Sequence, residues 1–409
     1  MRVLVAILFM VVLHSASALV PGMSQRINPA WAKEEHGKDG LAGGAELRFG
    51  MSTALSGPVA GLGRAMKDGV ELAFAEANAK GGVHGRRLRL IALDDSYHPP
   101  TAAANVERLI EQDRVLAIVG NLGTPTARLA MPLATEAGVL FYGAMSGADL
   151  LRANPPDRYV INFRASYDQE VSSMLDLLLA EGIQPEEIAF FTQDDSYGAS
   201  AYESAMRQLE ARGYTKARRL AHGRYPRNTL QVEAALVALI KAPVRPRAVI
   251  MVGAFRPSAK FILLARQVFP DMIYLNVSFV GSGPLKDLLK KSADPLSGTL
   301  PETLTVKVME VVPPLEANLP AVRAFHDARA RWAPGMEPSA ATLEGYLSAR
   351  VLLLGLEAAP APTRKDLVDS LLNMGQIDIG MGSPLYLSPA QHQASQAVWP
   401  VNLLNPTIP

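Results

Sequence analysis

The sequence predicts an α/β protein of two similar lobes, each a doubly wound parallel sheet with helices on both faces. Short apolar runs alternate with helical stretches from about residue 46, and the alternation restarts after residue 164. Repeated strand, loop and helix units are typical of parallel sheets that are covered on both sides. The chain has 409 residues, which is enough for two or three domains of roughly 100–200 residues each.

The composition is that of an ordinary globular protein, with 49% hydrophobic and 19% charged residues. The 40 basic and 39 acidic residues nearly cancel, so the charge gives no reason to expect binding to nucleic acid or to an anionic membrane surface. The chain has no cysteine, which excludes disulfides. The seven histidines are scattered without metal-ligand spacing, and we therefore expect neither a metal site nor a cofactor.

Residues 1–18 have the pattern of a secretory signal. One basic residue precedes an apolar run from Val3 to Leu13, and small residues end at Ala18. Such a pattern predicts cleavage after Ala18, and the run is shorter than the about 20 residues that a membrane-spanning helix needs. We expect export without a permanent membrane anchor, with an uncleaved anchor as the alternative. Residues 19–45 lack periodicity and are interpreted as a leader.

The first lobe is expected to begin with a strand at 47–51. Apolar residues then recur at three- and four-residue spacing over 63–80, which predicts a helix that Gly81 and Gly82 end. The next units are a strand at 88–95, a helix at 100–112, a short apolar run from Leu116 and a strand at 139–144.

After residue 164 the pattern predicts a second run of units and a C-terminal section. The expected helices are 169–181, 202–212, 261–268, 320–332 and 340–358, and the expected strands are 188–195, 248–254, 272–279 and 305–312, followed by a final strand pair at 384–388 and 397–404.

The stretch GNLGTPT, residues 120–126, is the first candidate for a binding site. It follows a buried apolar run and opens a helix, so it is expected at the carboxyl end of a strand. Open α/β sheets bind ligands in the crevice there, where a helix N-terminus presents unpaired N–H groups. The turn therefore predicts a grip on a small polar or anionic group, and an ordinary strand-to-helix turn without a ligand is the alternative.

Motifs of catalysis are missing from the sequence. Met66 stands where a dinucleotide fingerprint starting at Gly61 would have its third glycine, and neither a P-loop nor a G-x-S-x-G elbow occurs. The pair Asp94 and Asp95 is interpreted as a helix cap or solvated turn, because aspartate favours those positions. We therefore do not expect an enzyme.

Several stretches together resemble the periplasmic leucine/isoleucine/valine-binding protein family. They are GMSTALSGPVAGLG, NAKGGVHGRRLRL, VGNLGTPTARLA, QDDSYGASAY and VGAF, in that order along the chain. The resemblance spans about residue 46 to residue 404. It implies a type I periplasmic binding protein, with two lobes joined by three hinge crossings that close on a small ligand.

The resemblance also implies which residues form each lobe and what the protein does. The first lobe would be residues 46–166 with 299–381, and the second 167–298 with 382–409. The protein would be a periplasmic monomer that captures a small molecule and delivers it to the permease of an ABC-type importer.

The resemblance assigns half of a ligand site to the first lobe. In the family, a hydroxyl and N–H groups after the third strand, and an Ala-x-Thr turn after the fourth, hold the ligand's carboxylate. Thr124 matches the first position, and Ala144 and Ser146 match the second. In the second lobe the family has a tyrosine that Tyr197 matches, with a packed surface aromatic as the alternative for that residue.

The departures from the family concern the rest of the site. Phe255 replaces a second tyrosine, Leu62 replaces an aromatic at the pocket mouth, and Gly123 replaces one cysteine of a pair found in some members. Ser278 falls on or beside the glutamate that binds the ligand's ammonium.

A buried ammonium without a counter-charge costs several kcal/mol. Either another carboxylate replaces the glutamate, or the ligand has no ammonium. We favour a compact carboxylate or amide with an apolar body, although an amino-acid-like ligand stays open. Arg256 is a candidate for a second anionic group, with a solvated arginine as the alternative.

The sequence therefore predicts a solute-binding protein for transport. Two other functions stay open: a sensor of the same fold that feeds a signalling system, and, as the third choice, an exported α/β enzyme.

Overall fold

A computed structural model describes residues 46–292 and 304–404, and the expected signal (1–18) and leader (19–45) lie outside the described residues. The first sheet is parallel, with the strand order β2-β1-β3-β4-β5. Its strands are β1 (Glu46–Thr53), β2 (Arg87–Asp94), β3 (Ala117–Val119), β4 (Leu140–Tyr142) and β5 (Val160–Ile161).

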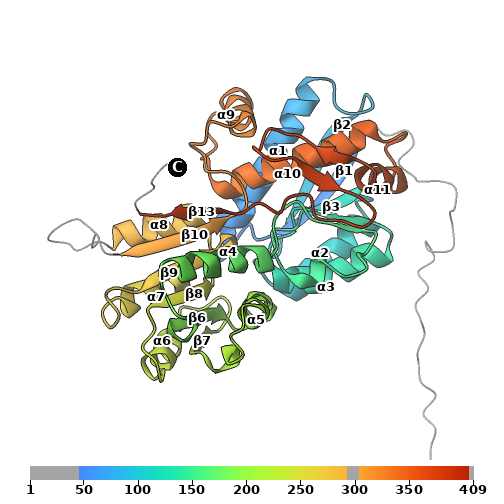
Figure 1. Cartoon of the computed structure of the whole chain (residues 1–409). Coiled ribbons are helices and arrows are strands. Elements are labelled where there is room, and N and C mark those ends of the chain that lie inside the picture. Colours follow the sequence, from blue (N-terminus) through green and yellow to red (C-terminus); the bar gives the residue numbers. More distant parts are fainter. Residues whose placement is uncertain (1–45, 293–303, 405–409) are drawn as a thin grey trace, which may run out of the picture. The chain divides into compact units, whose positions relative to one another are not determined.

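Helices cover the first sheet on both faces (Figure 1). Helix α1 (Ala60–Ala79) packs against α10 (Ala340–Ala358) on one face, and α2 (Pro99–Glu111) packs against α3 (Thr124–Glu136) on the other. All residues of β3 and β4 are buried, as expected for parallel strands covered on both sides. Gly81 and Gly82 have positive φ angles just beyond α1, which confirms that they end this helix.

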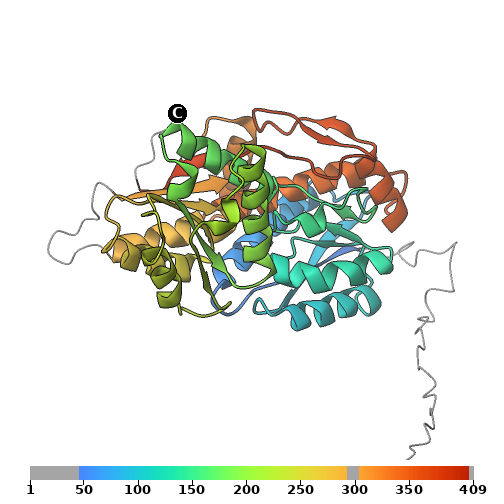
Figure 2. The ribbon, with the colours of Figure 1, turned by 60° about the horizontal axis from the view of Figure 1, so that its bottom comes forward.

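The second sheet has the order β13-β10-β9-β8-β6-β7, and only β13 runs antiparallel to its neighbour. Figure 2 shows the same ribbon from a second direction. The strands are β6 (Ile188–Gln193), β7 (His222–Tyr225), β8 (Ala248–Val252), β9 (Ile273–Val277), β10 (Thr305–Glu310) and β13 (Trp399–Asn402). The helices are α4 (Tyr167–Ala180), α5 (Ser196–Ala211), α6 (Glu233–Ile240), α7 (Phe255–Ala265) and α8 (Ser282–Lys291).

The remaining elements complete the first lobe and the connections. Helix α9 (Pro320–Trp332) packs on α1 and α10, and α11 (Arg364–Leu372) packs on α10. The strands β11 (Gly375–Ile377) and β12 (Leu385–Leu387) pair with each other. The described residues also form short 3₁₀ helices at η2 (Asp149–Leu151), η3 (Pro185–Glu187), η4 (Ala217–Arg219) and η5 (Ser278–Val280).

The described chain passes between the two lobes three times, at about 162–166, 311–319 and 388–398. The first and third crossings are hydrogen-bonded to each other: Asn162 N donates to His392 O at 2.7 Å, and Ser395 N donates to Phe163 O at 2.8 Å. The predicted fold class, two parallel-sheet lobes joined by a three-crossing hinge, is confirmed.

Two details of the predicted organisation are wrong. Strand β10 lies in the second sheet, where it pairs with β9 and β13, so the chain does not return to the first lobe at residue 299. The expected final strand pair does not pair with itself, because β12 pairs with β11 and β13 pairs with β10. An apolar run in the sequence predicts a strand but does not show which other strand it pairs with, because tertiary packing decides the pairing.

Candidate functional site

Thr124 and Ser146 form a hydroxyl pair at the carboxyl ends of β3 and β4. Thr124 is the first residue of α3, Ser146 follows β4, and their hydroxyl oxygens are 2.8 Å apart. Both side chains are fully buried, and Ala144 lies buried beside Ser146, whose N–H donates to the Ala144 carbonyl at 2.8 Å. The structure therefore brings together the three residues that the sequence predicted as the grip on an anionic group.

The hydroxyl pair faces Tyr167, a residue that the sequence did not single out. Tyr167 is the first residue of α4, is fully buried, and lies so close to Gly147 that a Cβ there would be 2.6 Å from its ring. Its hydroxyl lies beside those of Thr124 and Ser146 without a well-formed hydrogen bond. Burial raises the pKa of Tyr167 to about 12, so the phenol is neutral at pH 7.

An aromatic cluster joins the lobes around this point. The ring of Tyr197 lies 5.7 Å from that of Tyr167 and 4.7 Å from that of Phe279, and Phe279 lies 5.9 Å from Tyr97 of the first lobe. All four side chains are buried, so Tyr197 is not a surface aromatic. Tyr97 occupies the space over Gly123, where a Cβ would be 2.3 Å from its ring.

Polar contacts strengthen the junction between Tyr97 and the second lobe. Gln193 Nε2 donates to the Tyr97 hydroxyl at 3.3 Å, and the Arg227 guanidinium lies 5.9 Å from the centre of the Tyr97 ring. The Tyr225 hydroxyl in turn donates to Gln193 Oε1 at 3.1 Å. The two contacts of Tyr97 link residues of both lobes directly across the cleft.

Phe255 and Arg256 belong to the second lobe. Both begin α7; Phe255 is buried in the core of the second lobe, and the exposed Arg256 lies 5.8 Å from its ring. Arg256 lines a pocket of about 230 Å³ together with Val59 and Gln193. The structure thus places Arg256 at a pocket bordered by both lobes, and neither Thr124 nor Ser146 lines this pocket.

Ser278 is bonded to a carboxylate that the sequence did not predict. Glu170, from the first turn of α4, accepts from the Ser278 N–H at 2.7 Å and from its hydroxyl at 3.1 Å. Arg164, in the first hinge crossing, also donates to the Ser278 hydroxyl. A carboxylate therefore lies against the position where the resemblance expects a glutamate, but it comes from a different element.

Glu170 belongs to a charge cluster, defined here as Glu170, Glu310, Glu344, Arg164 and Arg152. Arg164 and the three glutamates are buried, and Arg152 is half-buried. Arg164 Nε lies 3.2 Å from Glu344 Oε1. Burial raises the pKa of Glu170 and of Glu310 to about 7 and also raises that of Glu344, while Arg164 acts in the opposite direction on all three.

Little in the sequence points to this cluster. Arg152 lies between β4 and β5, Arg164 lies between β5 and α4, and the three glutamates come from α4, β10 and α10, so the members are far apart in the chain. Glu170 follows the capping box of Ser166 and Gln169, where an acidic residue has an ordinary explanation in the helix dipole.

Leu62 and Ser278 line a pocket of about 630 Å³, which we call the acidic pocket. It is bordered by the start of α1, by the segment from η5 to α8, by the end of β10, and by residues 335–344. Its charged lining residues are Arg64, Asp68, Arg164, Asp287, Glu310, Glu337 and Glu344.

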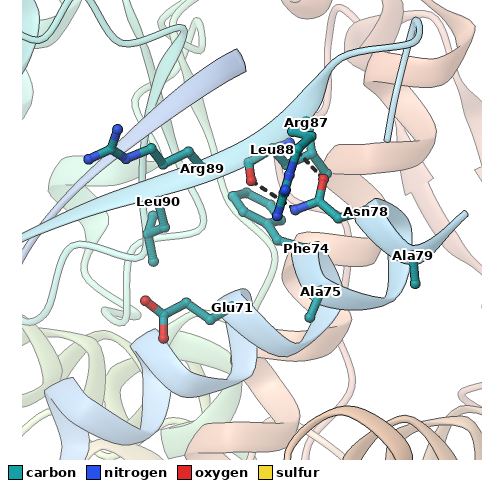
Figure 3. A pocket seen from close by; sticks show the side chains of 9 residues that line it. All are labelled: Glu71, Phe74, Ala75, Asn78, Ala79, Arg87, Leu88, Arg89 and Leu90. Atoms are coloured by element: carbon teal, nitrogen blue, oxygen red, sulfur yellow. Dashed lines mark hydrogen bonds between the residues drawn. The ribbon is translucent and has the colours of Figure 1, made fainter. Parts of the chain in front are cut away.

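Another hollow, of about 540 Å³, lies between α1 and β2 and is lined by Glu71, Phe74 and Arg87 among others (Figure 3). Here Asn78 bonds both backbone groups of Leu88, accepting from its N–H at 2.7 Å and donating to its carbonyl at 2.9 Å. Because Asn78 is already bonded to the Leu88 backbone and no buried polar side-chain atom of the lining lacks a partner, this hollow is a weaker candidate than the acidic pocket.

Within residues 46–292 and 304–404, no group of three or more His, Asp or Glu side chains is placed to hold a metal ion. In the same part of the chain, no helix is long and apolar enough to cross a membrane.

The family described as "Periplasmic binding protein" matches residues 46–405 of the chain. A solved structure of a possible leucine/isoleucine/valine-binding protein from Rhodopirellula baltica SH 1 is 43% identical, with a TM-score of 0.81, over 87% of this chain and 94% of that one. The chain belongs to the leucine/isoleucine/valine-binding-protein-like family of periplasmic binding proteins. This confirms the resemblance seen in the sequence.

Other members of the periplasmic binding protein family are more distant. A substrate-binding periplasmic protein from Ralstonia solanacearum is 26% identical, with a TM-score of 0.75, over 87% of this chain and 97% of that one. The Leu/Ile/Val-binding protein homolog 7 of Brucella abortus (strain 2308) is 29% identical over 208 residues, 48% of this chain and 50% of that protein. This chain thus spans about half the length of the curated relatives that it matches.

Proposed function

We propose that this protein captures a small solute between its two lobes in the periplasm and delivers it to an ABC-type importer. Membership of a periplasmic solute-binding family supports this role. The observation that carries the proposal is the set of side chains that meet at the cleft: the hydroxyl pair from the first lobe and the aromatic cluster from both. A ligand that contacts both lobes drives hinge closure, because it binds the closed state more tightly.

The proposed ligand is amino-acid-like, or a carboxylate or amide with an apolar body. Thr124 and Ser146 would hold its polar head, and Tyr197 would cover its body. Tyr167 covers the hydroxyl pair in this structure. For a ligand to reach the pair, Tyr167 must move away from it when the lobes open. The partner would be an importer permease, and the protein would act as a monomer without catalysis.

Calorimetric titration with amino acids, aliphatic and aromatic carboxylates, amides and ureas tests this function. We expect micromolar or tighter binding of at least one of these classes without turnover. Thr124→Ala should weaken that binding by about 10- to 150-fold, since a hydrogen bond to a charged group contributes about 1.5–3 kcal/mol.

Thr135→Ala provides the matched control. Thr135 is on the same helix, and its hydroxyl donates to the Pro132 carbonyl within that helix, so its loss should leave binding unchanged. If no class binds, the proposed function is wrong. If a ligand binds and both variants behave like the unmodified protein, the function stands and the assignment of Thr124 fails.

A further inference from the structure

We propose that the acidic pocket is a subsite for a positively charged group of the solute, an alkylammonium or a guanidinium, with Glu310 as its counter-charge. The proposal rests on the solute-binding function above and names the class of solute. It differs from the family pattern, in which the glutamate at the position of Ser278 would hold the ammonium.

The first argument is the balance of charges in the charge cluster. Three buried carboxylates, Glu170, Glu310 and Glu344, face one buried guanidinium, Arg164, and one half-buried guanidinium, Arg152. If all five groups are ionised, one negative charge has no partner within the cluster. An uncompensated carboxylate in a buried site costs several kcal/mol, so it takes up a proton or requires another cation.

The second argument identifies Glu310 as the uncompensated group. Glu170 accepts two hydrogen bonds from Ser278, and Glu344 lies 3.2 Å from Arg164. Glu310 is only 6% exposed, and its Oε1 has no hydrogen-bond partner in the structure. Of the two glutamates of the cluster that line the acidic pocket, Glu310 and Glu344, Glu310 is therefore the one that a bound cation would satisfy.

The pocket itself favours a cation. Five acidic residues and two arginines line it. Arg64 donates two hydrogen bonds to the Leu55 carbonyl, and Arg164 forms an ion pair with Glu344 and donates to Ser278, while its Nη1 has no hydrogen-bond partner. The net negative lining raises the local concentration of cations. Apolar residues between the acids offer contact to an alkyl chain: Leu62, Ala65, Met145, Pro284, Met336 and Pro338.

The pKa of Glu310 supports the same conclusion. Burial raises it to about 7, and Glu344 also raises it, whereas Ser282 and Arg164 act to lower it. The neighbouring Glu170, from α4, has a raised pKa for the same reason of burial. Near neutral pH the group therefore holds a proton for part of the time, and a bound ammonium or guanidinium would replace that proton.

Pairs of solutes that differ only in this charge test the proposal. We would titrate the purified protein with arginine and its neutral isostere citrulline, with lysine and norleucine, and with agmatine, which lacks the carboxylate. We expect a cationic probe to bind at least 10-fold more tightly than its neutral isostere at pH 8. Glu310→Gln should abolish this preference, while the neutral isostere binds as before.

Glu357→Gln is the control, because Glu357 is an exposed residue of α10 outside the pocket. It should keep the preference for the cation. Equal binding of both members of each pair, or a preference that survives in Glu310→Gln, overturns the proposal. If cations fail to bind while carboxylates or amides bind, this inference is wrong and the proposed function stands; if nothing binds in either series, both are wrong.

Discussion

Glu310 is a buried carboxylic acid whose environment penalises its charge. In the unfolded chain a glutamate has a pKa of about 4.3, and in the folded protein burial raises the pKa of Glu310 to about 7. Between these values the folded state binds more protons than the unfolded state. The contribution of Glu310 to stability is therefore fully present below about pH 4.3 and is lost as the pH rises to about 7.

Glu310→Gln should therefore change stability in a pH-dependent way. We compare the free energies of unfolding of the variant and the unmodified protein. Their difference should shift in favour of the variant by about 3 kcal/mol when the pH is raised from 5 to 8, because glutamine has no charge to bury. Urea unfolding of both proteins at the two pH values measures the shift. The exposed Glu357→Gln should show no such change, and an equal difference at both pH values would contradict the assignment.

The residues of the site differ in how far the sequence could predict them. Thr124 was predictable because it lies in the turn after a buried strand, where open α/β sheets bind ligands. Ser146, in the turn after the next strand, was assigned through the resemblance to the family. Glu170, Glu310 and Glu344 were not predictable, because they come from three elements far apart in the chain and Glu170 also has an ordinary local explanation at the start of α4. Only the hinge crossing at Arg164 and the packing of α4 and α10 bring them together.

At the level of elements, the turn from β3 to α3 depends on one glycine. Gly123 has a φ of +92°, and a Cβ there would lie 2.3 Å from the ring of Tyr97. The backbone conformation disfavours any side chain, and the buried ring has little room to move. This glycine allows Tyr97 of the first lobe to lie directly over the helix N-terminus that carries Thr124.

Gly123→Ala should lower the free energy of unfolding by about 2–4 kcal/mol, the sum of backbone strain and overpacking. Gly182→Ala serves as a comparison, because Gly182 has a φ of +74° with open space around it. The free energy of unfolding of Gly182→Ala should fall only by the cost of backbone strain, about 1–2 kcal/mol. Chemical denaturation measures both, and equal losses would show that Tyr97 does not restrict the position.

Long periodic helices were predicted best among the elements. The helices 320–332 and 340–358 were predicted with the bounds that α9 and α10 have, because proline or a serine cap begins each one. The short elements β7, α6, α8 and α11 were not recognised, and β10 and β13 were placed with the wrong partners. Strands of four to six residues depend on neighbours that the sequence does not name.

At the scale of the whole molecule, the proposed function requires the hinge to link ligand binding to a movement of the lobes. The charge cluster includes Arg164 of the first crossing and Glu310, which ends β10 just before the second. Contacts across the cleft, such as that between Tyr97 and Gln193, hold the lobes together in this structure. The account therefore predicts that a bound solute stabilises the state in which these contacts form.

The absence of cysteine from the chain allows this central claim to be measured with pairs of spin labels. Glu136→Cys on α3 and Glu210→Cys on α5 place exposed labels on different lobes. Glu136→Cys with Glu107→Cys on α2 places both labels on the first lobe and serves as the control. Electron paramagnetic resonance then gives the distance distribution of each pair, with and without a solute that calorimetry has shown to bind.

We expect saturating solute to shift the cross-lobe distribution to a shorter and narrower distance, while the distance within the first lobe stays constant. If the cross-lobe distance distribution stays the same at a saturating concentration of solute, the solute is not captured between the two lobes.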